Sequence, residues 1–345
     1  MAVRETDNDS GKRYKIVNVL LAFIAVSVLF LVGMVGAGVG LRTVFGVVVP
    51  YLAFCIFLIG LIYRVLGWAG VPVPFRIPTT CGQQKTLPWV RHDKLDNPGS
   101  TMGVIGRMAL EVLCFRSLMR NSRTEMTNGA YPVFRPSLLL WFGALAFHWS
   151  MLVVVTRHLR FFNEPVPSFI TLVTQADGIL QVGLPYYLIT SCIFLLSLIY
   201  LALRRMFNPQ VRYLSLFTDY FPLFLLCGVA LSGFWLRHVQ KADVVAIKEL
   251  VMGLVSLSPT VPENVSLLFY GHFFLVCTLI AYFPFSKLVH MAGVFLSPTR
   301  NMANNTRQVR HINPWDYPVK LHPYDEYENE FREKMKAAGI PVEKE

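Results

Sequence analysis

The chain has 345 residues, of which 54% are hydrophobic and 15% are charged, and its formal net charge is +11. Its mean hydropathy is +0.47. Because a soluble domain carries roughly 25% charged residues, this composition excludes a disordered chain, a nucleic-acid-binding arm and an ordinary cytosolic enzyme as the main interpretation. The apolar residues occur in long blocks, as membrane-spanning helices of about 20 residues require. The sequence therefore predicts an all-α, polytopic membrane protein without a nucleic-acid partner.

Six blocks contain no aspartate, glutamate, lysine or arginine, and each can cross, or nearly cross, a hydrocarbon core about 30 Å thick. They are residues 16–41, 43–63, 136–156, 178–203, 220–236 and 264–286. The fifth block is the shortest, and we expect residues 214–219 to extend it. The first block is too long for the apolar region of a typical signal peptide. We therefore expect a bundle of six transmembrane helices.

Lysine and arginine are distributed unevenly between the two sides of this bundle. With the N-terminus in the cytoplasm, 26 of the 32 lie in segments on the inner side. The remaining six are Arg42, Arg157, Arg160, Arg237, Lys241 and Lys248. Because cytoplasmic loops are enriched in lysine and arginine, we expect a multi-pass protein of the cytoplasmic (inner) membrane with both termini cytoplasmic.

The predicted spans divide the chain into four parts. These are an N-terminal tail with two spans (1–67), a cytoplasmic insertion (68–135), a four-helix membrane core (136–290) and a cytoplasmic tail (291–345). In the insertion, residues 102–120 are expected to form an amphipathic helix that lies on the membrane, with partner docking as the alternative. A second amphipathic stretch is expected at 244–257. The tail is expected to dock a subunit through a helix at 325–338, with solvated disorder as the alternative.

The cysteines exclude several redox cofactors. The six cysteines are residues 55, 81, 114, 192, 227 and 277, and none forms a C-x-x-C or C-x-x-C-H motif. These motifs are typical of iron–sulfur clusters and of c-type haem attachment. Any such group in the system must therefore belong to a partner.

Four histidines lie in or at the ends of predicted spans, where ionisable residues are costly and usually functional. His148 and His158 belong to the third span, and His272 and His290 to the sixth. When these antiparallel spans are matched by depth, His158 meets His272 on the outer side and His148 meets His290 on the inner side. Two histidine pairs at different depths suit two stacked b-type haems, because a neutral imidazole can bind iron from each side.

One difficulty concerns the spacing along the helices. On straight helices His148 and His158 are about 15 Å apart, whereas His272 and His290 are about 27 Å apart. We expect Pro284 to kink the sixth span and to shorten the second separation. Hydrogen bonding between helices is the alternative role for these histidines. Zinc fits less well, because the pairs lack further acidic or cysteine ligands.

Small and basic residues complete the predicted haem environment. Glycines could let a flat ring approach the backbone, and the candidates are Gly143, Gly228, Gly233 and Gly271. Basic residues on the outer side could neutralise haem propionates, and the candidates are Arg157, Arg160, Arg237 and Lys241. No residue is predicted to be catalytic.

The histidine spacings of ten and eighteen residues, on an outward and an inward helix, resemble those of the respiratory nitrate reductase gamma subunit family. By that resemblance His158 and His272 bind the outer haem, and His148 and His290 bind the inner haem. The chain differs in its extra N-terminal span and its long insertion. The segments "CGQQKTLPWVRHDKLDNP", "EVLCFRSLMRN" and "INPWDYP" are similar to the M subunit family of DsrMKJOP, a membrane complex associated with dissimilatory sulfite reductase.

The resemblance implies a function as well as a fold. It implies a dihaem cytochrome b that transfers electrons between menaquinone and a cytoplasmic iron–sulfur subunit, similar to heterodisulfide reductase and DsrK-like, in sulfur or sulfate metabolism. It also implies the other DsrMKJOP subunits as partners, including a periplasmic multihaem cytochrome c, besides membrane lipid. The alternative is a gamma-type cytochrome b of a nitrate or heterodisulfide reductase. A cofactor-free membrane anchor or transporter is the alternative from another class.

The quinone site cannot be transferred from the nitrate reductase subunit. The lysine that helps to bind quinol there has no counterpart, because the corresponding region reads "TLVTQADGILQ". Quinone chemistry couples electron and proton transfer, so polar groups must lie within hydrogen-bond reach. The candidates beside the outer haem are His238, Arg157, Arg160 and Asp177. The alternative for His238 and both arginines is that their polar ends lie at the membrane interface.

Overall fold

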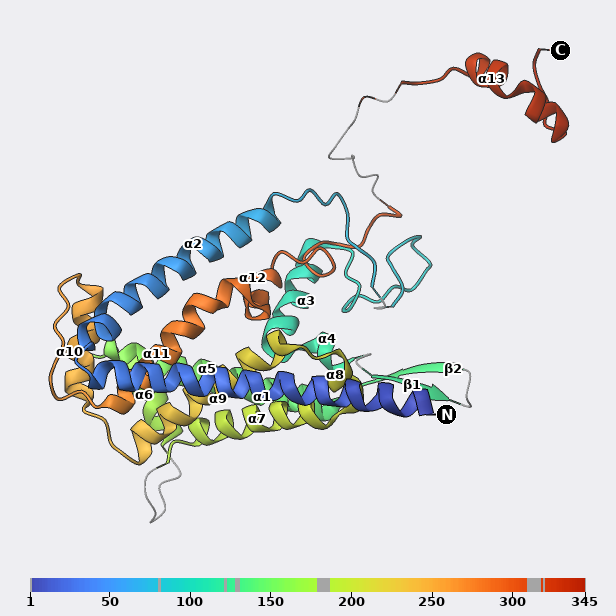
Figure 1. The fold of residues 1–345 in the computed structure, drawn as a ribbon. Helices are drawn as coiled ribbons and strands as arrows, with labels where there is room; N and C mark the ends of the chain where they lie inside the picture. Colours follow the sequence, from blue (N-terminus) through green and yellow to red (C-terminus); the bar gives the residue numbers. More distant parts are fainter. Residues whose placement is uncertain are drawn as a thin grey trace.

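The structure is a computed structural model that describes residues 2–79, 82–120, 123–127, 131–178, 187–308, 318 and 320–344. Its main helices are α1 (Ala2–Gly38), α2 (Val49–Ala69), α5 (Leu138–His158), α7 (Ile189–Phe207), α9 (Phe217–His238) and α11 (Leu267–Tyr282) (Figure 1). Six segments of the described chain are long and apolar enough to cross a membrane. They are Ile16–Gly38, Val44–Ala69, Leu138–Phe161, Ile189–Phe207, Phe217–His238 and Leu267–Phe285. The mostly helical class and the number of candidate membrane-spanning helices, six among the described residues, agree with the prediction.

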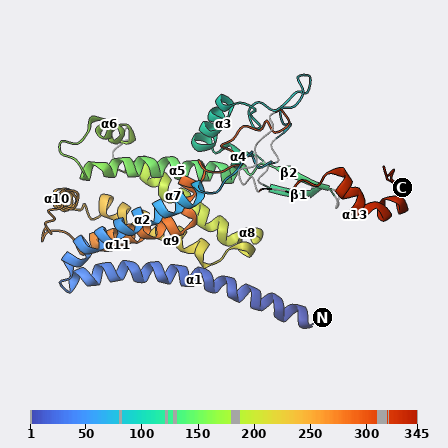
Figure 2. The same cartoon turned by 90° about the horizontal axis from the view of Figure 1, so that it is seen from above.

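Helix α11 packs against α1, α2 and α9, whereas α5 packs against α7, which in turn packs against α9. Seen from above, α1 and α5 therefore lie on opposite sides of the bundle (Figure 2). Within the described residues, α5 and α11 do not pack closely against each other. The two spans that carry the histidines are thus connected through α7 and α9.

Glycines allow α1 and α11 to approach closely. A Cβ atom added at Gly33 would lie 2.7 Å from the carbonyl oxygen of Tyr270, and one added at Gly271 would lie 2.7 Å from Cε2 of Phe30. Small residues allow this close backbone approach between membrane helices. Gly271 therefore serves the packing of α1 against α11, and its place beside a haem stays a prediction.

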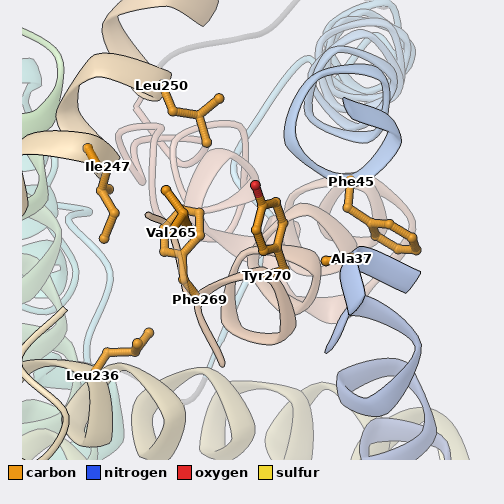
Figure 3. Close-up of a cluster of buried hydrophobic side chains, with 9 residues drawn as sticks. Ala37, Phe45, Leu236, Ile247, Leu250, Val265, Phe269 and Tyr270 are labelled. Carbon is orange, nitrogen blue, oxygen red and sulfur yellow. The ribbon is translucent and has the colours of Figure 1, made fainter. Parts of the chain in front are cut away.

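A buried apolar cluster closes one end of the bundle, where α10 (Val244–Val255) covers α11 and the π-helical turn η1 (Val44–Val48) (Figure 3). The cluster comprises Ala37, Phe45, Leu236, Ala246, Ile247, Leu250, Val265, Phe269 and Tyr270. Helix α10 begins after Asp243, whose side chain accepts hydrogen bonds from the backbone N–H groups of Val245 and Ala246. The predicted helix at 244–257 is confirmed, and we call this end of the bundle the α10 side.

The last span is interrupted where the sequence predicts a kink. Helix α11 ends at Tyr282, and two short 3₁₀ turns, η3 (Phe283–Phe285) and η4 (Lys287–Val289), lead into α12 (His290–Gly293). Proline lacks a backbone N–H and clashes with the preceding helical turn, which explains the interruption at Pro284. His290 therefore lies on a separate short helix that has its own direction.

The insertion forms two helices and a hairpin. Helix α3 (Thr101–Cys114) and helix α4 (Arg116–Met119) are separated by Phe115, whose φ of 50° is left-handed. Strands β1 (Arg123–Thr127) and β2 (Tyr131–Arg135) pair antiparallel. The prediction of one helix over 102–120 is therefore wrong at Phe115, because a left-handed residue cannot continue a right-handed helix.

Helix α3 buries charged groups and exposes apolar ones. Arg107 and Glu111 are buried, whereas the side chain of Met102 is 76% exposed. Arg107 forms ion pairs with Asp96 at 3.6 Å and with Glu111 at 3.9 Å. The charged face of α3 therefore packs inside the insertion, where Asp96 supplies a buried partner.

The insertion and the segment after α12 are hydrogen-bonded into one unit, which we call the insertion layer (residues 72–79, 82–120 and 295–308). The guanidinium of Arg76, which is 1% exposed, donates to the carbonyl of Thr299 and to the side chain of Asn97. Asn304 also donates to the side chain of Asn97, at 2.7 Å. The first part of the tail is therefore structurally part of the insertion layer.

The remaining described elements are shorter. They are the 3₁₀ turn η2 (Leu159–Phe161) and helices α6 (Ser168–Asp177), α8 (Pro209–Leu214) and α13 (Tyr324–Ala337). Helix α13 confirms the helix predicted at 325–338. Residues 312–317 of the "INPWDYP" motif and residues 179–186 of the fourth predicted block lie outside the described residues.

Candidate functional site

His148 and His290 lie side by side next to the insertion layer, and we call them the insertion-side pair. Their ring centroids are 6.1 Å apart and their planes form an angle of 84°. His148 projects from the middle of α5, and His290 is the first residue of α12. Phe115 and Phe147 each lie 4.7 Å from the ring of His148. The interruption at Pro284 thus brings together two residues far apart in the sequence.

The spacing of the insertion-side pair fits a metal ion between the two rings. With metal–imidazole bonds of about 2.0–2.1 Å and a ring centre about 1 Å beyond each bonding nitrogen, the two centroids would be roughly 6 Å apart. The observed separation of 6.1 Å matches this value. Within the described residues, no group of three or more His, Cys, Asp and Glu could hold a metal ion. Two imidazoles are the axial ligand set that haem iron can take from a protein.

The Nδ1 atom of all four histidines has a hydrogen-bond partner. The partners are the carbonyl oxygens of Ala144 for His148 (2.8 Å), Val154 for His158 (2.7 Å) and Lys287 for His290 (2.8 Å), and the hydroxyl of Ser232 for His272 (2.9 Å). A carbonyl can only accept, so Nδ1 carries the proton in the first three. In a neutral imidazole held in this way Nε2 is the unprotonated nitrogen, which is the tautomer that binds a metal through Nε2.

His158 and His272 form the second pair, which we call the α10-side pair. His158 is the last residue of α5, next to η2, which contacts α10. His272 lies in the first half of α11, close enough to His158 for the two side chains to interact electrostatically. The two pairs therefore lie at different levels of the bundle, and each joins α5 to the α11–α12 segment.

The glycines that were predicted to border a haem contact different groups from one another. A Cβ at Gly143 would lie 2.5 Å from the ring of Tyr200, and one at Gly228 would lie 3.0 Å from Val26. These two glycines serve helix packing, and their place beside a haem stays a prediction. A Cβ at Gly233 would instead lie 3.0 Å from Cε1 of His272. Of the four predicted glycines, Gly233 is the one that leaves room for a candidate ligand.

A buried ion pair lies beside the α10-side pair. Arg157 donates to Asp177 at 2.6 Å, and their side chains are 9% and 2% exposed. Asp177 also accepts hydrogen bonds from the backbone and side chain of Thr190, and Arg157 donates to Ser191. The network links α5, α6 and the start of α7. Arg157 and Asp177, both predicted near the outer haem, are therefore brought together and neutralise each other.

The other predicted polar candidates lie in different surroundings. The ring of His238 lies 4.6 Å from that of Phe234 and 5.2 Å from that of Tyr187. Arg160 is half-buried, whereas Arg237 and Lys241 are exposed. His238 thus belongs to an aromatic cluster at the end of α9, which the histidine spacing alone did not indicate.

Sequence reasoning missed Ser232 and Phe115, which contact candidate ligands. Ser232 lies 40 residues before His272 and on another helix, and Phe115 lies in the insertion. Serines are common in membrane helices, and a single one carries no signal of its partner. The one available signal is that Ser232 and Gly233 are two adjacent small residues of α9, which leave space for a bulky ring from another helix.

The fold defines a mostly helical chain with six candidate membrane-spanning helices, in which two histidine pairs lie at different levels. The chain belongs to the family described as nitrate reductase gamma subunit, whose profile matches residues 102–311. This is a family of gamma-type cytochrome b subunits, which implies haem b. The matched residues include both histidine pairs, and α1 and α2 lie outside them.

Two relatives cover most of the chain. A protein of Archaeoglobus fulgidus, named Hdr-like menaquinol oxidoreductase cytochrome b-like subunit, is 43% identical over 280 residues, which are 79% of this chain and 83% of the relative. A protein of the same name from Archaeoglobus profundus is 42% identical over 298 residues, which are 84% and 86% of the two chains. Both similarities also include residues outside the family match, because each covers more of the chain than residues 102–311.

Proposed function

We propose that this chain is a dihaem cytochrome b subunit that passes electrons between menaquinol and an iron–sulfur partner. One haem b is held by His148 and His290, and the other by His158 and His272. The single observation that carries this proposal is the 6.1 Å separation of the His148 and His290 rings, together with the carbonyl groups that fix the proton on Nδ1. The family membership and the names of both relatives support it.

When bound, haem iron supplies reversible one-electron transfer at a potential set by its ligands and surroundings. The chain holds the imidazoles in the required tautomer and spaces them along α5. Both pairs use α5 and the α11–α12 segment, so the two proposed haems would lie one after the other between the α10 side and the insertion layer.

The insertion layer is proposed as the cytoplasmic side, where an iron–sulfur subunit resembling heterodisulfide reductase docks. Phe115 connects this layer to the ring of His148. Both termini are proposed to lie in the cytoplasm, in the inner membrane. The finer proposal is that the chain is the M subunit of a DsrMKJOP complex in sulfur or sulfate metabolism. The partners would then be its DsrK-like subunit and the other subunits, including a periplasmic multihaem cytochrome c.

Menaquinol is proposed to react near the α10-side pair. His238 and Arg160 are the polar groups proposed to contact the quinol head group. Arg157 and Asp177 hold each other at 2.6 Å, so we propose that they fix the end of α5 and supply a polar wall. Quinol oxidation releases protons as well as electrons, and the neutral imidazole of His238 would accept one.

The test is reduction of the purified chain in proteoliposomes by menadiol, followed through the b-type haem α-band. We expect rapid reduction in the wild-type chain and slower reduction in His238→Ala, with haem content unchanged. The matched control is His322→Ala, because His322 is an exposed histidine of the tail. Unchanged reduction in His238→Ala would exclude its role, and a chain without the α-band after haem-replete expression would favour a cofactor-free anchor.

A further inference from the structure

One of the four candidate ligands is fixed by another helix. His148, His158 and His290 each bond a carbonyl of the preceding turn through Nδ1. His272 of α11 instead bonds two groups of α9, the hydroxyl of Ser232 and the backbone carbonyl of Val229. The orientation of His272 therefore depends on how α9 and α11 pack, whereas the other three are oriented by their own segments.

The geometry around Ser232 defines the direction of its hydrogen bonds. Its oxygen lies 2.6 Å from the carbonyl oxygen of Gly228 and 2.9 Å from Nδ1 of His272. A carbonyl can only accept, so the hydroxyl donates its hydrogen to Gly228. Its lone pair then accepts the Nδ1–H of His272. Ser232 is 8% exposed, so water does not readily replace it.

A hydroxyl affects a metal ligand differently from a carbonyl. The group that accepts the second ring N–H sets the orientation of a ligating histidine and raises its basicity. A hydroxyl oxygen is a weaker acceptor than a helix carbonyl oxygen, so it gives the imidazole less negative character. An imidazole with less negative character stabilises ferric iron less, which raises the reduction potential.

We propose that Ser232 is a positioning residue for the α10-side haem, and that its hydrogen bond to His272 sets the potential of that haem separately from the insertion-side haem. The proposal rests on the proposed function, because it requires haem between His158 and His272. Gly233, the next residue of α9, leaves space at Cε1 of the same ring. Two adjacent residues of α9 thus determine how His272 is held.

The test is a potentiometric titration of the purified holoprotein, with EPR spectra of the oxidised low-spin haems. In Ser232→Ala the Nδ1–H is left to the carbonyl of Val229, which is a stronger acceptor, so we expect one midpoint potential to fall and the EPR signal of the same haem to shift. Ser232→Thr keeps the hydroxyl and should restore both values. The matched control is Ser197→Ala, because Ser197 is also a buried span serine but bonds only the carbonyl of Phe194.

Single-haem backgrounds assign the change. The shift should persist with His148→Ala, where the α10-side haem remains, and should disappear with His158→Ala. Loss of the α10-side haem alone in Ser232→Ala, with retention in Ser232→Thr, would also support the positioning role. The positioning role would be overturned if Ser232→Ala kept two haems with the same potentials and EPR signals as the Ser197→Ala control. It would also be overturned if Ser232→Ala lost the insertion-side haem. A wild-type chain without haem would instead refute the proposed function.

Discussion

Phe115 and His148 lie with their ring centroids 4.7 Å apart in an edge-to-face arrangement. Phe115 is the left-handed residue between α3 and α4. The same residue therefore ends helix α3 and brings the insertion into contact with a candidate ligand. Trp141 and Trp149 of α5 donate to the carbonyls of Cys114 and Leu113, just before this break. The insertion layer is thus attached directly to the part of α5 that carries His148.

Replacement of Phe115 should affect the insertion-side pair alone. Phe115→Gly keeps a residue that readily adopts positive φ while it removes the ring from His148. We expect a shift in the potential and EPR signal of one haem, and no change at the other. Redox titration of both haems measures this. The control is Phe162→Ala, an exposed aromatic residue after η2, and equal shifts at both haems in Phe115→Gly would contradict the expected contact.

The Arg157–Asp177 pair should be important for stability. Removing one partner of a buried ion pair leaves an uncompensated charge and costs about 3–5 kcal/mol. Asp177→Asn and Arg157→Met should therefore each lower the thermal unfolding temperature of the purified chain, whereas the double variant should recover part of the loss. Differential scanning calorimetry in one detergent measures this. Additive losses in the double variant would show that the two side chains do not stabilise each other.

Asp96 should hold the insertion layer together. Its side chain is 4% exposed and forms ion pairs with Arg107, Arg116 and Arg120. Hydrogen bonds to charged groups contribute about 1.5–3 kcal/mol each, so Asp96→Asn should open the layer before the membrane helices unfold. Limited proteolysis should then cut within residues 72–120. Asp325→Asn is the control, because Asp325 is 67% exposed on α13. Protection equal to the wild type would contradict this role.

The membrane spans could be predicted because the length of an apolar block is read directly from the sequence. The structure of the insertion could not be predicted in this way. Its helix at 102–120 looks amphipathic from periodicity, yet Arg107 faces inward because Asp96 meets it from a separate turn. The pairing of His148 with His290 was predictable from depth and from Pro284. The roles of the glycines were not, because only the packed bundle shows that Gly143 meets Tyr200.

The folded tail should depend on pH. The backbone N–H groups of Glu343 and Lys344 and the side chain of Arg332 donate to Glu328, and the Glu343 amide is the main cause of the lowered pKa of this carboxyl. A lowered folded pKa stabilises the folded form above the ordinary glutamate pKa of about 4.3, and the stabilisation is lost as the pH falls through the folded value.

Amide hydrogen exchange of Glu343 and Lys344 in the full chain measures this dependence. Both amides should be protected at neutral pH and lose protection, relative to the intrinsic exchange rate, as the solution is acidified below about pH 4. In Glu328→Gln the protection should be weaker at neutral pH and nearly independent of pH. Glu330→Gln is the control on the same helix, and a wild-type profile in Glu328→Gln would contradict the assignment.

The most direct test of the central claim is the amount of haem b per chain. Pyridine haemochrome absorbance, divided by protein from amino-acid analysis, should give two haems for the wild type and one each for His148→Ala and His158→Ala. His322→Ala should retain two. A wild-type chain with one haem or none, or a His148→Ala variant that keeps both, would contradict the assignment of two iron centres to the two histidine pairs.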